Sequence, residues 1–184
     1  MKKLVMLMIV IAMLSGCAVW VRTDGPYVAS EQNISLELPD GWMRWNMDKD
    51  DFLILTRDGL DLQSIMVETI KAGDQLKNTK KKLRKGMLPL EAAEVILDNV
   101  SSSPKVHGLE VKENKSAKID GHSGFRAVFT YKEDDGLKMK GVFYGFMQGE
   151  VLYGIKYLAA QRHYFDRDLK VFERVVASVR LVKS

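Results

Sequence analysis

The sequence of 184 residues predicts an α+β fold, in which helices flank a mainly antiparallel sheet. Three observations lead to this prediction. Apolar and polar residues alternate over much of the chain, as they do in strands that bury one face. Helical spacing of apolar residues is confined to a few segments, with strand-like stretches before and after them. Gly, Asp and Pro separate neighbouring strand candidates, which favours tight turns between antiparallel strands.

The N-terminal segment has the layout of a signal peptide for export. Lysines at positions 2 and 3 precede an apolar run from Leu4 to Leu14, which falls short of the ~20 residues that a membrane-spanning helix needs. The run leads into Leu14-Ser15-Gly16-Cys17, which resembles the bacterial lipobox, where a peptidase cuts before a cysteine that becomes acylated. We therefore expect a signal peptide over residues 1–16 and a lipidated Cys17, rather than a buried structural cysteine.

We expect acyl chains on Cys17 to anchor the protein to a membrane of the cell envelope. Two or more chains, at ~0.8 kcal/mol per buried CH₂, hold a protein stably where one chain does not. The residue after the cysteine is Ala18 rather than Asp. This resembles the sorting signal of Gram-negative lipoproteins that are sent to the outer membrane and face the periplasm. Cys17 is the only cysteine, so the domain must be stabilised by packing without a disulfide.

The rest of the chain is predicted to form a tether and one domain. Residues 17–33 mix Gly25, Pro26 and polar residues, which is typical of a tether of at most about 50 Å, and residues 34–184 form the domain. Removing the signal peptide takes away two lysines and no acidic residue, so the formal net charge of +4 falls by two. This charge gives no indication of a nucleic-acid partner.

The first half of the domain is predicted to contain four strands followed by two helices. Trp42 and Trp45 fall three apart on the second strand candidate, so they are expected on opposite sides of the sheet, with at least one in the core. A short basic helix is expected from Asp74 to Lys85, ended by Gly86, and a second helix from Pro89 to about Val100. The strand candidates lie at residues 34–38, 42–47, 52–57 and 62–71.

The second half is predicted to consist of strands closed by a helix. Strands are expected around residues 109–119, 125–131 and 151–157, with a further alternating run before the Gln148-Gly149-Glu150 turn. Asp135-Gly136 lies between two such runs, which predicts a hairpin with a type I′ turn. A terminal helix is expected because one apolar stripe joins Phe165, Leu169, Phe172, Val176 and Val179.

Three segments of the chain resemble the PsbP-like family, over roughly residues 33–181. They are Leu38-Pro39-Asp40-Gly41-Trp42, Ile119-Asp120-Gly121-His122-Ser123-Gly124-Phe125 and Phe172-Glu173-Arg174-Val175-Val176-Ala177-Ser178-Val179-Arg180. The resemblance implies an α/β/α sandwich. It also implies a role in binding or assembly more often than in catalysis.

A cluster of cations is the strongest charge asymmetry in the sequence. Its members are Lys77, Lys80, Lys81, Lys82, Arg84 and Lys85. Each cation near an anionic lipid surface adds ~1 kcal/mol of attraction. The cluster is therefore a candidate contact for anionic lipid, an acidic envelope glycan or an acidic partner protein, and the alternative is a solvated helix face.

The residue types that carry chemistry do not form a recognisable catalytic or metal-binding motif. His107, His122 and His163 lack ligand spacing for a metal, and Gly121 to Phe125 departs from a nucleophile elbow because Phe125 replaces its last glycine. The acidic groups at 48–51 and 133–135 lie in turn-like stretches and do not fit calcium-loop spacing.

These observations predict a non-catalytic lipoprotein of the envelope that binds or assists a membrane or periplasmic partner. We expect no cofactor, no metal and no catalytic residue. The alternative is an envelope hydrolase in which His122 or His163 meets a distant carboxylate.

Overall fold

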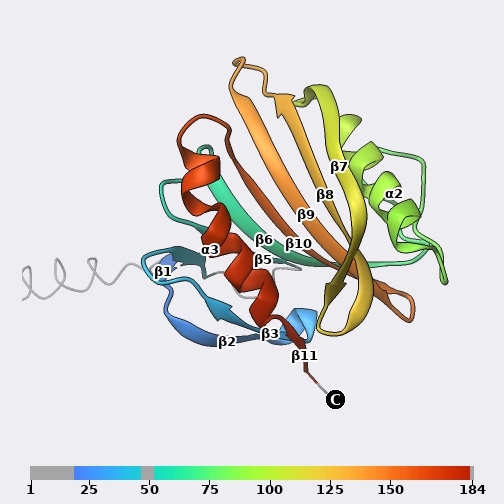
Figure 1. Ribbon diagram of the computed structural model, residues 1–184, viewed down its shortest axis with the longest axis horizontal. Helices are drawn as coiled ribbons and strands as arrows, with labels where there is room; N and C mark the ends of the chain where they lie inside the picture. Colours follow the sequence, from blue (N-terminus) through green and yellow to red (C-terminus); the bar gives the residue numbers. More distant parts are fainter. Residues whose placement is uncertain (1–18, 47–51, 183–184) are drawn as a thin grey trace, which may run out of the picture.

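The computed structural model describes residues 19–46 and 52–182, which form three layers (Figure 1). Helix α2 (Pro89–Ser101) covers one face of a large sheet, while helix α3 (Tyr164–Ser178) and a small sheet cover the other. Every strand pairing in both sheets is antiparallel, so the predicted α+β class and α/β/α sandwich are confirmed. None of the helices in these residues is long and apolar enough to cross a membrane.

The large sheet has eight strands in the order β1-β4-β5-β6-β10-β9-β8-β7. Their bounds are Trp20–Arg22 (β1), Met43–Trp45 (β4), Phe52–Thr56 (β5), Gln63–Lys71 (β6), His107–Ile119 (β7), His122–Lys132 (β8), Lys138–Gln148 (β9) and Val151–Ala160 (β10). The small sheet has the order β11-β3-β2, with bounds Gly25–Ala29 (β2), Ile34–Leu38 (β3) and Arg180–Leu181 (β11), and a short 3-10 helix, η1 (Ser30–Gln32), links β2 to β3.

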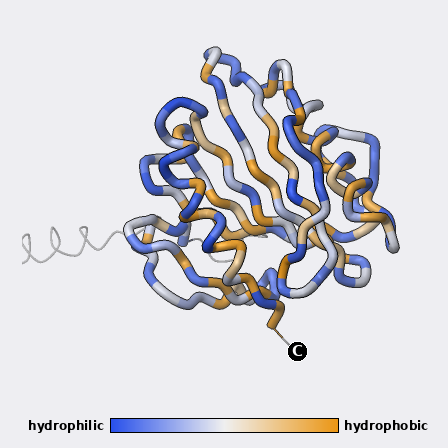
Figure 2. The backbone as a smooth tube through the Cα atoms, in the orientation of Figure 1, coloured by the Kyte–Doolittle hydropathy of each residue, from blue (hydrophilic) through white to orange (hydrophobic). Residues whose placement is uncertain are grey.

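Apolar and polar residues alternate along the strands (Figure 2), and the apolar ones build a separate core on each face of the large sheet. Ile65 and Val67 of β6 are fully buried between the sheet and α3. Phe125 and Phe129 of β8 are fully buried beneath α2. The predicted stripe of α3 is confirmed, because Phe165, Phe172 and Val176 are buried and Leu169 packs against them.

Glycines in the strands make room for the aromatic rings beneath α2. A Cβ added at Gly141 would lie 2.4 Å from the ring of Phe129, its cross-strand neighbour, and one at Gly145 would lie 2.6 Å from Phe125. Gly154 leaves similar space for Phe143. Ring and glycine therefore fit together as pairs across neighbouring strands.

The tether predicted for residues 17–33 is wrong in most of its length. Residues 20–22 form β1, which pairs with β4, and residues 25–32 form β2 and η1. The short strands escaped prediction because Gly25 and Pro26 are typical of loops, although Pro26 here lies on an edge strand, where proline is tolerated. The domain therefore begins only three residues after Cys17, which itself lies outside the described residues.

The basic helix predicted from Asp74 to Lys85 is also absent, since this stretch is an irregular loop. Leu76 and Leu83 are buried in the core beneath α2, and the N–H of Gly73 donates to the carbonyl of Leu83 at 2.9 Å, which closes the loop on itself. The backbone N–H of Asn78 donates to Asn99 Oδ1 at 2.8 Å, which ties the loop to α2. Buried contacts with α2 thus replace the internal hydrogen bonds of a helix.

The hairpin at Asp135-Gly136 is confirmed, but its turn type is not. The N–H of Gly136 donates to the carbonyl of Glu133 at 2.9 Å, and Gly136 has a positive φ of 85° while Asp135 does not. A turn over residues 133–136 followed by a left-handed glycine is the geometry of a longer loop rather than a two-residue type I′ turn.

We expect Gly141→Ala to lower the free energy of unfolding by about 1–3 kcal/mol, because the added methyl group overlaps the Phe129 ring. Chemical denaturation of the variant measures this loss. In a Phe129→Leu background the same substitution should cost less, since the smaller side chain vacates the site. Equal losses in both backgrounds would show that the Phe129 ring is not the source of the strain.

Candidate partner-binding surfaces

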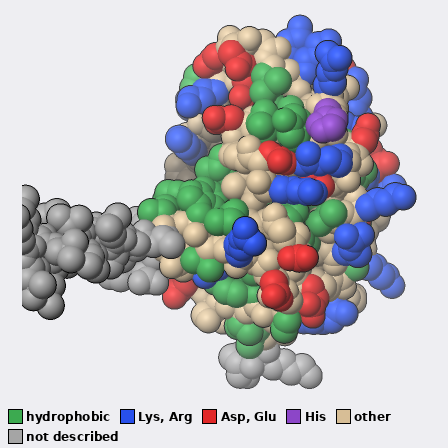
Figure 3. Space-filling model, turned by 90° about the vertical axis from the view of Figure 1, so that its left-hand side faces the viewer, with side chains coloured by type: hydrophobic (Ala, Val, Ile, Leu, Met, Phe, Trp, Pro, Cys, Tyr) green, Lys and Arg blue, Asp and Glu red, His purple; other side chains and the backbone are tan. Residues whose placement is uncertain are grey.

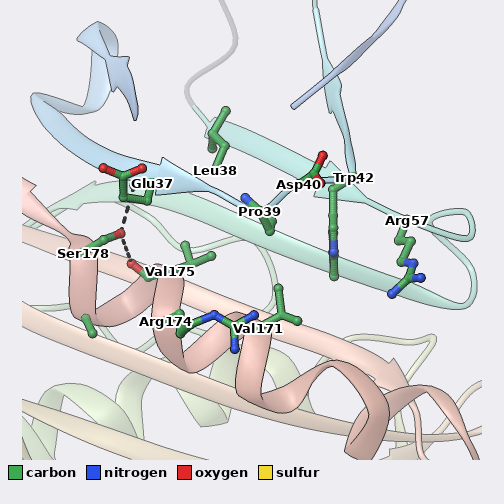
Figure 4. A pocket seen from close by; sticks show the side chains of 11 residues that line it. Glu37, Leu38, Pro39, Asp40, Trp42, Arg57, Val171, Arg174, Val175 and Ser178 are labelled. Atoms are coloured by element: carbon green, nitrogen blue, oxygen red, sulfur yellow. Dashed lines mark hydrogen bonds between the residues drawn. The ribbon is translucent and has the colours of Figure 1, made fainter. Parts of the chain in front are cut away.

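An apolar groove of about 610 Å³ lies between β3 and the C-terminal half of α3 (Figure 4). Its apolar lining comes from Leu38 and Pro39 on one side and Val171 and Val175 on the other, with Trp42 between them. Charged side chains lie around it. The complete lining is Glu37, Leu38, Pro39, Asp40, Trp42, Arg57, Val171, Arg174, Val175, Ala177 and Ser178.

The turn after β3 places Trp42 in this groove. Gly41 has a φ of +73°, which reverses the chain after Pro39 and Asp40 and brings Trp42 back towards α3. Trp42 is 1% exposed and Trp45 is half-buried on the other face of the sheet, so the expectation of opposite sides holds.

A hydrogen-bonded bridge closes one end of the groove. The N–H of Glu37 donates to Ser178 Oγ at 2.9 Å, and the Ser178 hydroxyl donates to the carbonyl of Val175 at 2.7 Å (Figure 4). A second hollow of about 490 Å³ lies beyond this bridge along β2 and β3. The bridge therefore fixes the spacing of strand and helix between two adjoining hollows.

The charges around the groove differ in whether they are already paired. Arg57 Nη1 lies 3.2 Å from Oδ1 of Asp168, whose side chain is 1% exposed. Within the described ranges, the side chains of Glu37, Asp40 and Arg174 have neither an ion-pair partner nor a hydrogen bond. Two carboxylates and one guanidinium thus remain available to a partner.

Polar networks hold α3, and with it the groove wall, against the large sheet. Near its N-terminus, Asp168 accepts from Gln63 Nε2 at 2.9 Å and from Arg167 Nη2 at 2.6 Å. Further along, Glu173 accepts from the hydroxyl of Tyr144 at 2.6 Å and from Arg126 at 3.1 Å. Burial, together with the Glu173 carboxylate, raises the pKa of Tyr144 to about 12, so this hydroxyl stays a donor at neutral pH.

The cation cluster, residues 77–85, lies on the loop that packs against α2. All six cations are exposed, and Figure 1 places this loop at the end of the molecule opposite β1. Three of the cations are engaged. Lys81 pairs with Asp98 at 2.7 Å, Lys82 donates to the carbonyl of Gly73 at 2.9 Å, and Lys85 lies 3.2 Å from Glu150.

The other three cations of the cluster are unpaired within the part of the chain that the structure describes. They are Lys77, Lys80 and Arg84. The hydrogen bond from Lys81, followed by that from Thr79, lowers the pKa of Asp98, so the loop keeps this ionic link to α2 at neutral pH. The loop therefore holds these three unpaired cations in a fixed position on the surface.

The three histidines lie in different surroundings. His107 Nε2 lies 2.7 Å from Asp134 on the surface, His122 stacks on Phe146 at 5.0 Å, and His163 meets Tyr164 edge-on at 5.1 Å. In the described residues, neither His122 nor His163 contacts a carboxylate, and no three His, Cys, Asp or Glu residues are grouped to hold a metal.

The remaining sequence candidates for chemistry lie in turns. Gly121 has a φ of +77° in the tight turn between β7 and β8, so Gly121 to Phe125 forms a hairpin and not a nucleophile elbow. The acidic residues at 133–135 form the hairpin turn already described, and those at 48–51 lie outside the described residues.

No protein-family model and no curated protein matches this sequence, whereas several solved structures match its fold. Cyanobacterial PsbP from Synechocystis sp. PCC 6803 superposes with a TM-score of 0.62 at 12% identity, covering 92% of this chain and 99% of that one. The Saccharomyces cerevisiae Ran-binding protein Mog1p gives 0.59 at 10% identity, covering 89% and 97%. This chain spans half of a Bacteroides thetaiotaomicron protein, covering 88% of itself, with a TM-score of 0.55 and 10% identity.

Sequence identities this low are evidence for the fold alone. The superpositions on PsbP and Mog1p cover both chains nearly from end to end. The chain therefore has the PsbP/Mog1-like fold, as its three resembling segments imply.

Proposed function

We propose that the chain is a non-catalytic, lipid-anchored protein of the bacterial cell envelope that binds a partner protein. The groove between β3 and α3 carries this proposal. Its apolar centre is surrounded by charges of both signs, three of them unpaired in the described residues, and this is the anatomy of a protein interface rather than of a reaction centre.

The groove fits an extended or helical segment of a partner that inserts an apolar side chain over Trp42. Carboxylates at Glu37 and Asp40 and the guanidinium of Arg174 would then pair with charges on either side of that anchor. The shared fold of a Ran-binding protein supports a protein as the partner. No observation supports the hydrolase alternative, since neither His122 nor His163 lines the groove.

The cation cluster supports a second contact, with an acidic region of the partner. Its place opposite β1 separates it from the membrane that would hold Cys17, so lipid of that membrane is a poorer candidate than a protein. The three unpaired cations would attract such a region in a salt-dependent way.

We expect a photo-crosslinking residue at Ala177, which lines the groove, to capture one discrete partner in intact cells. The same residue at Lys170, exposed on the same helix but outside the groove, should not capture it. Arg174→Glu should lower the yield from Ala177 about tenfold, equivalent to ~1.4 kcal/mol of binding. Equal capture from both positions, or no effect of Arg174→Glu, would remove the groove from the interface.

We expect the triple variant Lys77→Glu, Lys80→Glu, Arg84→Glu to abolish salt-sensitive recovery of the partner on immobilised protein. In the part of the chain that the structure describes, the side chains of Lys77, Lys80 and Arg84 make no ion pair or hydrogen bond, so the fold should be retained. A matched control reverses the exposed Lys118, Lys132 and Lys170, which changes the net charge equally and should leave recovery intact. The idea fails if the two triple variants behave alike.

A further inference from the structure

Among the residues that the structure describes, one end of the large sheet is apolar on a face that neither core covers. On the side that α2 occupies, α2 packs against β7, β8 and β9, far from β1, β4 and β5 in the strand order. We call the residues left at this end the open face, and they belong to neither buried core. They are Trp20, Met43, Trp45, Phe52, Ile54 and Met66.

Strand register shows that these side chains share one side of the sheet. Trp20 lies opposite Trp45, and Ile54 lies opposite Met66. The residue between Phe52 and Ile54 is Leu53, which points into the core beneath α3 with 5% exposure. Alternation therefore directs the open face away from α3.

The open face is accessible and aromatic. Phe52 is 39% exposed, and the rings of Trp20 and Trp45 meet edge-on with centroids 5.0 Å apart. Val19, just before β1, is 41% exposed. Figure 3, which faces the β1 end of the molecule, shows hydrophobic side chains gathered on part of this surface.

The length of chain before β1 limits where the open face can be. Trp20 is the third residue after Cys17, and at ~3.6 Å per residue the chain between them spans at most about 11 Å. β1 is an edge strand, so the chain leaves the sheet directly beside the open face. The backbone of Cys17 is therefore within about that distance of Trp20, and any lipid on Cys17 is attached at that point.

We propose that the open face rests on the bilayer that holds Cys17, with Trp20 and Trp45 in its interfacial region. This inference rests on the lipid anchor of the proposed function. Indole rings favour the membrane interface because their bodies are apolar and their N–H groups can still meet water or lipid headgroups. Arg22, the next residue of β1 on the same side, is exposed and suits a phosphate group.

This arrangement keeps the cation cluster at the end of the large sheet that is distant from the proposed anchor. The open face lies at the β1 end of the molecule, and residues 77–85 lie at the opposite end (Figure 1). The groove, lined from β3 and α3, lies on the other side of the large sheet from the open face. Both proposed contacts thus stay accessible to a partner.

Fluorescence quenching by brominated lipid tests the inference without relying on natural acylation. Residues 17–184 are coupled through Cys17, the only cysteine, to a maleimide lipid in neutral phosphatidylcholine vesicles. The protein has three tryptophans, and Trp42 is buried. Brominated acyl chains should remove much of the emission of the unmodified protein and little from a Trp20→Phe, Trp45→Phe variant that keeps only Trp42.

An orientation control adds Lys80→Trp to that double variant, which places an indole on the cation cluster, and its emission should stay unquenched. The inference is overturned if the unmodified protein is quenched no more than the double variant, because the open face then meets water, another protein or a second copy. Quenching of the added tryptophan would also overturn it. Neither result depends on whether cells acylate Cys17. The experiment therefore tests the orientation of the domain separately from the proposed lipid anchor.

Discussion

The width of the large sheet is the constraint on which the rest of the structure depends. Eight strands spaced ~4.8 Å apart extend over roughly 34 Å, whereas a helix with its side chains is only ~10–12 Å wide. One helix therefore cannot cover a face. On the face covered by α2, the loop that buries Leu76 and Leu83 covers part of the sheet that the helix leaves exposed. On the opposite face, the small sheet covers strands that α3 does not reach.

The groove, the cation cluster and the open face each result from how the faces of the large sheet are covered or left uncovered. The groove is the seam between the two elements that share one face, α3 and β3. The cation cluster is the outer side of the loop that widens the cover of α2. The open face is the part of the sheet that α2 and its loop do not reach. A single packing requirement thus separates the proposed anchor end from the proposed partner-binding surfaces.

Much of the fold was predictable because alternation and helical spacing are local signals. The strands around Ile65 and Phe125 and the stripe of α3 were found in this way. β1 was missed because three residues carry no periodicity, and its partner β4 lies more than twenty residues away. The basic loop was misread as a helix because its stability comes from contacts with α2 that no local pattern shows.

The groove could not be predicted, since Trp42 and Val171 are distant in sequence and meet only through the docking of α3. By contrast, the exposure of the cation cluster followed from composition, and only the structure distinguishes its paired members from Lys77, Lys80 and Arg84. Pairing depends on single side-chain distances, which composition does not contain.

The proposed position of the open face at the membrane depends most directly on the chemistry at Cys17. Mass spectrometry of the N-terminal peptide, from protein extracted from membranes, measures that chemistry. We expect a peptide that begins at Cys17 and carries a diacylglyceryl thioether. A mature chain that begins elsewhere, or a free Cys17 thiol on protein recovered in the soluble fraction, would contradict it.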